Sequence, residues 1–156
     1  LPVSFALLLN LVSVSNADNK NVLWGFIKNY APEASPEMLP MLDAMADYAV
    51  AYYHDFVKPA KSYRNPDETE KQAMISLRDK LNNLSDDLDA EEIQTEVYAI
   101  GKTYFEDNLR DWFKALYEVL LGQSQGPRFG SFIAVYGLER TVELINQALN
   151  GDLTAD

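Results

Sequence analysis

The stretch LRDWFKALYEVLLGQSQGPRFGSFIAVYG, residues 109–137, indicates most directly how this chain folds. It contains two apolar stripes at helical spacing, the first at Leu109, Trp112, Phe113, Leu116 and Leu120, and the second at Phe129, Phe132, Ile133 and Tyr136. Between them, Gly122 stands where a left-handed residue ends a helix, and Pro127 suits the first position of the next one. The stretch therefore predicts two helices joined by a tight corner.

Helical patterns recur along the rest of the chain, and no run shows the strict alternation that is typical of a half-buried strand. Asn65 and Pro66 predict a helix start, as an N-cap and a first helical residue, and Asp89 with Glu92 predicts another. We therefore expect an all-α fold, an irregular bundle or cage of about eight helices. It should form a single domain over residues 1–150, and residues 151–156 should be a frayed tail.

The composition excludes several classes of function. The 156 residues include no cysteine, which rules out disulfides, thiolate metal ligands and cysteine nucleophiles. The formal net charge of -11 opposes non-specific attraction to nucleic acid or to an anionic membrane. This charge is uneven, because residues 66–96 hold ten Asp or Glu against three Lys or Arg, whereas residues 97–130 hold four of each. Any contact with an anionic partner should avoid the first of these segments.

The opening LPVSFALLLNLVSVSNA has the apolar run and small-residue ending of a signal peptide. It lacks an initiator methionine and a basic residue before Asp18, and its apolar residues Phe5, Leu8, Leu9 and Val12 have the spacing of a buried helix. We expect a core helix here, in a chain that is a piece of a longer protein.

The sequence offers no catalytic constellation. His54 is its only histidine, so neither a zinc centre nor a di-iron bundle site has its usual ligands, and we assign no metal ligand and no catalytic residue. Phosphate-binding glycine motifs are absent as well. The sequence therefore favours a binding function.

One candidate binding site lies at the corner of the opening stretch. Arg128, beside the free N–H groups of a helix start, suits an anion, and the amides of Gln123 and Gln125 complement the edge of an unpaired uracil. Ser131 falls on the same side of the predicted helix as Arg128. The alternative is a purely structural corner between two helices.

A second candidate is the segment YYHDFVKPAKSYR, residues 52–64. It interleaves aromatic rings with basic residues, a pattern that suits single-stranded RNA, and its candidate contacts are Lys58, Lys61, Tyr63 and Arg64. The alternative is a helix end whose rings are core and whose lysines complement the helix dipole.

The stretch at residues 109–137 closely resembles the C-terminal region of class I lysyl-tRNA synthetases. Three further segments resemble the same family: VSFALLLNLVS near the start, LWGFIKNYAP at residues 23–32, and DFVKPAKSYR. The resemblance implies the helical cage that binds the lysine-specific tRNA through its uridine-rich anticodon, in the cytoplasm. The family's Rossmann catalytic domain, with its HIGH and KMSKS signatures, attaches lysine using ATP, and neither signature occurs here.

The resemblance thus implies an anticodon-binding fragment that is not an enzyme by itself and holds no cofactor, since ATP would bind the parent's catalytic domain. Its partners would be the tRNA and that N-terminal catalytic domain, without a membrane. The alternative function is a free-standing helical adaptor that binds protein through its acidic face. A secreted helical protein is a third, weaker hypothesis.

Overall fold

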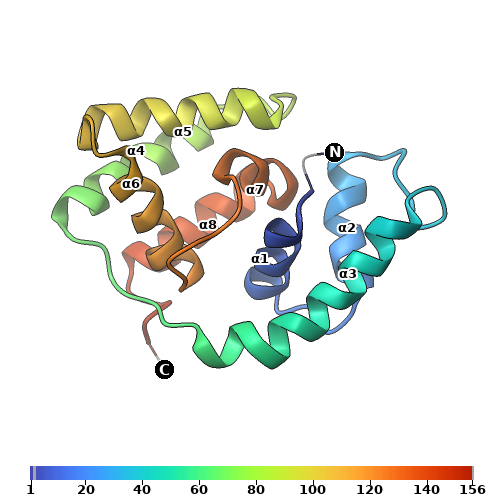
Figure 1. Cartoon of the computed structure of the whole chain (residues 1–156). Coiled ribbons are helices and arrows are strands. Elements are labelled where there is room, and N and C mark those ends of the chain that lie inside the picture. The colour runs from blue at the N-terminus through green and yellow to red at the C-terminus, as the bar shows by residue number, and fades with distance from the viewer. Residues whose placement is uncertain (2, 156) are drawn as a thin grey trace. The chain divides into compact units, whose positions relative to one another are not determined.

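The computed structural model describes residues 1 and 3–155, and within them the fold is all-α, with eight α-helices and no strand. This confirms the expected fold class and helix count (Figure 1). The helices group into two compact units, Leu1–Lys61 and Ser62–Asp156. Among the described residues, no helix is long and apolar enough to cross a membrane.

The first unit contains α1 (Phe5–Ser15), α2 (Lys20–Tyr30) and α3 (Pro40–Tyr52). The predicted stripe of α1 is buried at Leu8 and Val12, and the ring of Phe5 contacts Tyr48 and Tyr52 of α3. Helix α2 is joined to α3 by Asp43, which accepts hydrogen bonds from Trp24 and Lys20. The opening residues therefore form a core helix of this unit.

Helix α3 continues into a π-helical turn at Tyr53–Val57 and a short 3₁₀ turn at Lys58–Ala60. Pro59 lies in this last turn, where its missing N–H prevents a regular α-helix from continuing. The proline thus accounts for the end of this helix.

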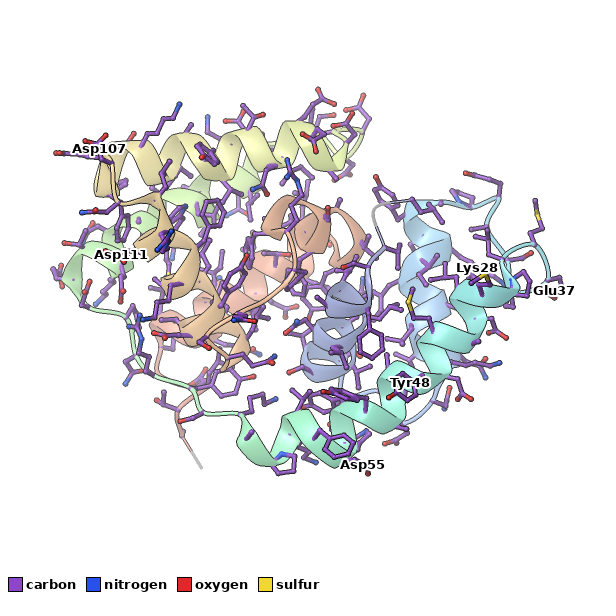
Figure 2. The ribbon with its side chains drawn as sticks, viewed as in Figure 1. Lys28, Glu37, Tyr48, Asp55, Asp107 and Asp111 are labelled. Atoms are coloured by element: carbon purple, nitrogen blue, oxygen red, sulfur yellow. The ribbon has the colours of Figure 1, made fainter. Side chains whose placement is uncertain are left out.

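The second unit contains α4 (Glu68–Asn82), α5 (Ala90–Phe105), α6 (Leu109–Leu116), α7 (Phe129–Tyr136) and α8 (Leu138–Leu149). Trp112 of α6 is fully buried and donates a 3.0 Å hydrogen bond from its indole N–H to the Val97 carbonyl of α5. Gly101 makes room for this indole, because a Cβ there would lie 2.5 Å from it. Figure 2 shows Asp107 and Asp111 where α5 turns into α6.

Helix α7 packs directly against α5 through a glycine. A Cβ on Gly130 would lie 2.6 Å from the Ala90 carbonyl oxygen and 2.7 Å from the Gln94 backbone nitrogen. Contacts this short are not possible, so only glycine allows the two backbones to approach so closely. This packing fixes the start of α7 against one face of α5.

Acidic capping boxes begin α4 and α5. Asp89 and Glu92 each bond the other's backbone N–H, as the sequence predicts. The predicted start at Asn65 and Pro66 is wrong, because the N-cap is Asp67, whose box is completed by Glu70. The Asp67 carboxylate accepts from the Glu70 N–H and the Glu70 carboxylate accepts from the Asp67 N–H, so two carboxylates decide where the helix begins.

The C-terminal end continues past α8 in turns. Gly151 adopts a left-handed conformation, and Thr154 donates a 3.1 Å hydrogen bond to the side chain of Asn65. Asp156 lies outside the described residues, so the fraying of residues 151–156 stays a prediction, as does a domain boundary at residue 150.

Candidate nucleic-acid interface

The loop from Gly122 to Arg128 joins a π-helical turn at Tyr117–Leu121 to α7 and is anchored along its length. Gly122 has a φ of 70°, the left-handed conformation predicted for it. Its carbonyl accepts a 2.9 Å hydrogen bond from the Ser62 N–H, and the Tyr117 hydroxyl donates one of 2.9 Å to the Pro127 carbonyl. The corner is therefore a fixed helix–loop–helix connection.

The Tyr117 ring also packs against the loop at Gly126. A Cβ on Gly126 would lie 2.5 Å from this ring, so the loop can cross the ring only with glycine at that position. Burial raises the pKa of the Tyr117 hydroxyl, which keeps it protonated as a donor.

The start of α7 differs from the prediction. The helix begins at Phe129, not at Pro127, and Arg128 is its N-cap. The Gly130 N–H donates a 2.6 Å hydrogen bond to the side-chain oxygen of Gln94 on α5. Gln94 of α5 thus occupies one of the N–H groups that we expected an anion to contact, so the Arg128 side chain carries the anion-binding hypothesis at this corner.

Arg128 is the cation of this corner, and its side chain is 53% exposed. Its guanidinium lies 3.0 Å from the Glu91 carboxylate of α5, which is itself 75% exposed. An ion pair between such exposed groups contributes little free energy, so a phosphate can replace the carboxylate at small cost.

The other residues predicted at the corner differ in access. Gln125 is exposed, Gln123 is half-buried and engaged in contacts of its own, and Ser131 is buried in α7. Gln125 and Arg128 are therefore both exposed on the loop, whereas Ser131 is buried.

The second predicted segment is divided between the two units, since Lys58 and Lys61 lie in the first and Tyr63 and Arg64 in the second. Lys58 is exposed. Lys61 is half-buried and donates hydrogen bonds to the Ser13 and Tyr53 hydroxyls, at 2.9 and 2.7 Å. Tyr63 is half-buried, with contacts of its own.

Arg64 forms an internal network. It donates two hydrogen bonds, of 2.7 and 2.9 Å, to the Glu70 carboxylate and one of 2.7 Å to Glu118. Burial opposes ionisation of Glu70, but the bonds from Arg64 and Asp67 outweigh it and hold the pKa of Glu70 below its ordinary value. The guanidinium of Arg64 is thus committed to two carboxylates of its own unit.

Sequence reasoning missed a cavity beside Arg128. It has a volume of about 290 Å³, and its lining includes Arg128 together with Glu91, Gln94, Thr95, Tyr98 and Lys102 of α5. Gln94, Tyr98 and Lys102 are spaced four residues apart, which places them on one helix face. This spacing is the sequence signal from which the α5 side of the cavity could have been predicted.

Among the residues that the structure describes, no group of His, Asp or Glu side chains could hold a metal ion. His54 is half-buried, and its Nε2 lies 3.1 Å from the Ala17 carbonyl oxygen.

Curated relatives match nearly the whole chain. A lysine–tRNA ligase of Roseobacter denitrificans is 56% identical over 154 residues, which are 99% of this chain and 29% of the relative. Those of Rickettsia felis and Rickettsia bellii are 48% identical over 147 residues, 94% of this chain and 28% of each relative. No family model matches the chain, and no solved structure matches it either.

An identity of 48–56% over an alignment that covers almost the whole chain shows that the chain is homologous to aminoacyl-tRNA synthetases. More particularly, it belongs to the lysine–tRNA ligase family, and it spans between a quarter and a third of the length of these relatives. These relatives lend no support to the alternative of a free-standing acidic adaptor.

Proposed function

We propose that this chain is the C-terminal, anticodon-binding part of a class I lysine–tRNA ligase that works in the cytoplasm. In the complete enzyme, a separate Rossmann domain would attach lysine to the tRNA with ATP. The helical part would recognise the uridine-rich anticodon and would carry no catalytic residue. The relatives, lysine–tRNA ligases by name, support the parentage.

The observation that carries the anticodon-binding role is the exposed Arg128 on an anchored loop, next to an open cavity and the exposed amide of Gln125. A fixed loop offers its side chains without a large ordering cost. Arg128 would hold a backbone phosphate, and Gln125, with Gln123, would contact base edges.

Roles for the remaining candidates follow from their contacts. Lys58 is exposed and would add a backbone phosphate contact. Lys61 and Arg64 are held by internal partners, so we assign them structural roles, and the buried Ser131 would support α7 from within. Tyr63 remains a proposed contact.

The net charge of -11 is compatible with this proposal because the corner lies outside the most acidic segment, residues 66–96. Attachment to a catalytic domain that holds the acceptor end would make anticodon contact effectively intramolecular. Base contacts could then provide specificity with little affinity of their own.

The test is a titration of the 156-residue chain with two anticodon stem-loops, one carrying UUU and one carrying GAG. We expect weak, salt-sensitive binding that prefers UUU and is reduced by Arg128→Ala. Arg78→Ala is the matched control, because Arg78 also pairs with an exposed carboxylate of the same unit, that of Asp79. Equal affinity for the two loops would remove the base-reading role and leave the family assignment intact.

A further inference from the structure

The cavity between α5 and Arg128 combines an aromatic ring, two cations and two polar side chains, those of Gln94 and Glu91. Tyr98 is 41% exposed, and its ring centroid lies 5.9 Å from that of Phe113, so a neighbouring ring supports it from α6. An exposed ring with fixed support is a platform on which an unpaired base stacks.

Two cations flank this platform. The Lys102 ammonium lies 5.5 Å from the centre of the Tyr98 ring, and Arg128 lines the same cavity. Lys102 is exposed on a long flexible stem, so its ammonium can leave the ring and follow the phosphate of an incoming nucleotide. The base would then replace one cation–π contact with a larger stacked area.

The two polar side chains of the cavity, Gln94 and Glu91, offer different hydrogen-bonding groups. The Gln94 side-chain oxygen is held by the Gly130 N–H at 2.6 Å, which fixes the amide and leaves its NH₂ group out of this bond. Glu91 can only accept while it is ionised. A fixed donor beside an acceptor matches uracil, whose N3–H lies between two carbonyl oxygens, whereas the N3 of cytosine is an acceptor that a carboxylate repels.

We propose that this cavity is a pocket for one unpaired uracil of the anticodon loop. The base stacks on Tyr98, its N3–H donates to Glu91, and a carbonyl accepts from the Gln94 amide. As the base enters, Arg128 leaves Glu91 and binds a backbone phosphate. The exposed ion pair between Arg128 and Glu91 therefore belongs to the empty pocket and opens on binding. This inference rests on the anticodon-binding role proposed above.

The first test is photocross-linking of the 156-residue chain to UUU stem-loops that carry 5-iodouridine at one anticodon position at a time. We expect one position to cross-link to Tyr98. Tyr98→Leu should abolish that cross-link and weaken binding about tenfold, the loss of one stacked base. Tyr104→Leu is the matched control, since Tyr104 is similarly exposed on the same helix, at 37%, and does not line the cavity.

The outcomes separate this inference from the proposed function. If the chain prefers UUU but cross-links elsewhere, and both tyrosine variants bind equally, the pocket is refuted and the anticodon-binding role stands. If the wild-type chain does not distinguish the two loops, both proposals fail together.

The second test concerns the polar side chain of Glu91. Glu91→Gln replaces the acceptor-only carboxylate with an amide that can also donate, so the chain should discriminate less between uracil and cytosine at the cross-linking position. The variant keeps a side chain of the same size, which preserves the cavity. Unchanged discrimination would overturn the assignment of Glu91 as the reader of N3–H.

Discussion

The segment Lys58–Arg64 and the corner Gln123–Arg128 look alike in the sequence, since each ends in an arginine that has an aromatic neighbour, Tyr63 or Phe129, and a proline close by. In the structure their arginines differ. Arg64 binds Glu70 and Glu118, whose side chains are 10% and 25% exposed, whereas Arg128 pairs with Glu91, which is 75% exposed. The burial of the partner carboxylate, not the presence of a cation, separates a structural arginine from one available to a ligand.

The physical reason lies in solvation. A carboxylate that is mostly withdrawn from water needs a cation and hydrogen bonds, so removing Arg64 would leave Glu70 poorly compensated. Glu91 is solvated whether or not Arg128 is present. Arg128 is thus free to change partners, and the arginine variants below test this difference.

The largest effect is expected where α7 packs on α5 and holds the corner. Gly130→Ala places a Cβ against the backbone of both Ala90 and Gln94, so the helices must separate, at a cost of about 1–3 kcal/mol in the free energy of unfolding. Gly25→Ala in α2 is the control, because nothing lies within 4 Å of its Cβ, and it should stabilise the chain by about 0.5–1 kcal/mol. Urea unfolding measures both. Equal effects would mean that α5 and α7 are not in this close contact.

The next largest effect is the difference between Arg64 and Arg128 in how much their substitution lowers the free energy of unfolding. Arg64→Ala should cost about 1–2 kcal/mol, a value below that of a fully buried pair because the Arg64 side chain is 40% exposed. Arg128→Ala should change the free energy of unfolding by less than about 0.5 kcal/mol. Thermal or urea unfolding of the two variants side by side checks this. Similar losses would contradict the distinction drawn between them.

Acidification should reduce the contribution of Arg64. Because the folded-state pKa of Glu70 lies below its ordinary 4.5, the network contributes stability that is fully present above that pH and is lost as the pH falls through the lower value. The stability gap between wild type and Arg64→Ala should therefore narrow in acid. Urea titrations at neutral pH and at about pH 3 measure it. A gap that does not depend on pH would show that Glu70 is not the group responsible.

The smallest effect concerns salt. If Arg128 holds one phosphate, Arg128→Ala should reduce the slope of log affinity against log salt by roughly 0.7, the value for one contact on a single strand. The same substitution at Arg64 should leave the slope unchanged, once binding is corrected for the folded fraction. Stem-loop titrations at several salt concentrations give both slopes.

Local signals in the sequence were sufficient to predict the helices, but not the starts of α4 and α7. The apolar stripes, the capping box of Asp89 and Glu92, and the left-handed Gly122 are confirmed, because each depends on residues within about one turn of each other. The start at Asp67 was missed because Asn65 followed by proline has the same local signature. When two residues could serve as the N-cap, the helix begins at the one whose side chain reaches a free backbone N–H.

The contacts that define the site could not be predicted, because they join residues far apart in the chain. Arg64 meets Glu118 across 54 positions, and Gln94 caps Gly130 across 36. Neither spacing has a periodic signal. The spacing of Tyr98 and Lys102 was visible, but only the approach of α7, which Gly130 permits, turns that helix face into a cavity.

The different roles of the two arginines are tested most directly by comparing Arg64→Gln and Arg128→Gln in binding to the UUU stem-loop, at a temperature where both variants remain folded by circular dichroism. We predict that Arg128→Gln weakens binding by about five- to tenfold while Arg64→Gln leaves it within about twofold of wild type. Weaker binding by Arg64→Gln, with Arg128→Gln unaffected, would contradict it.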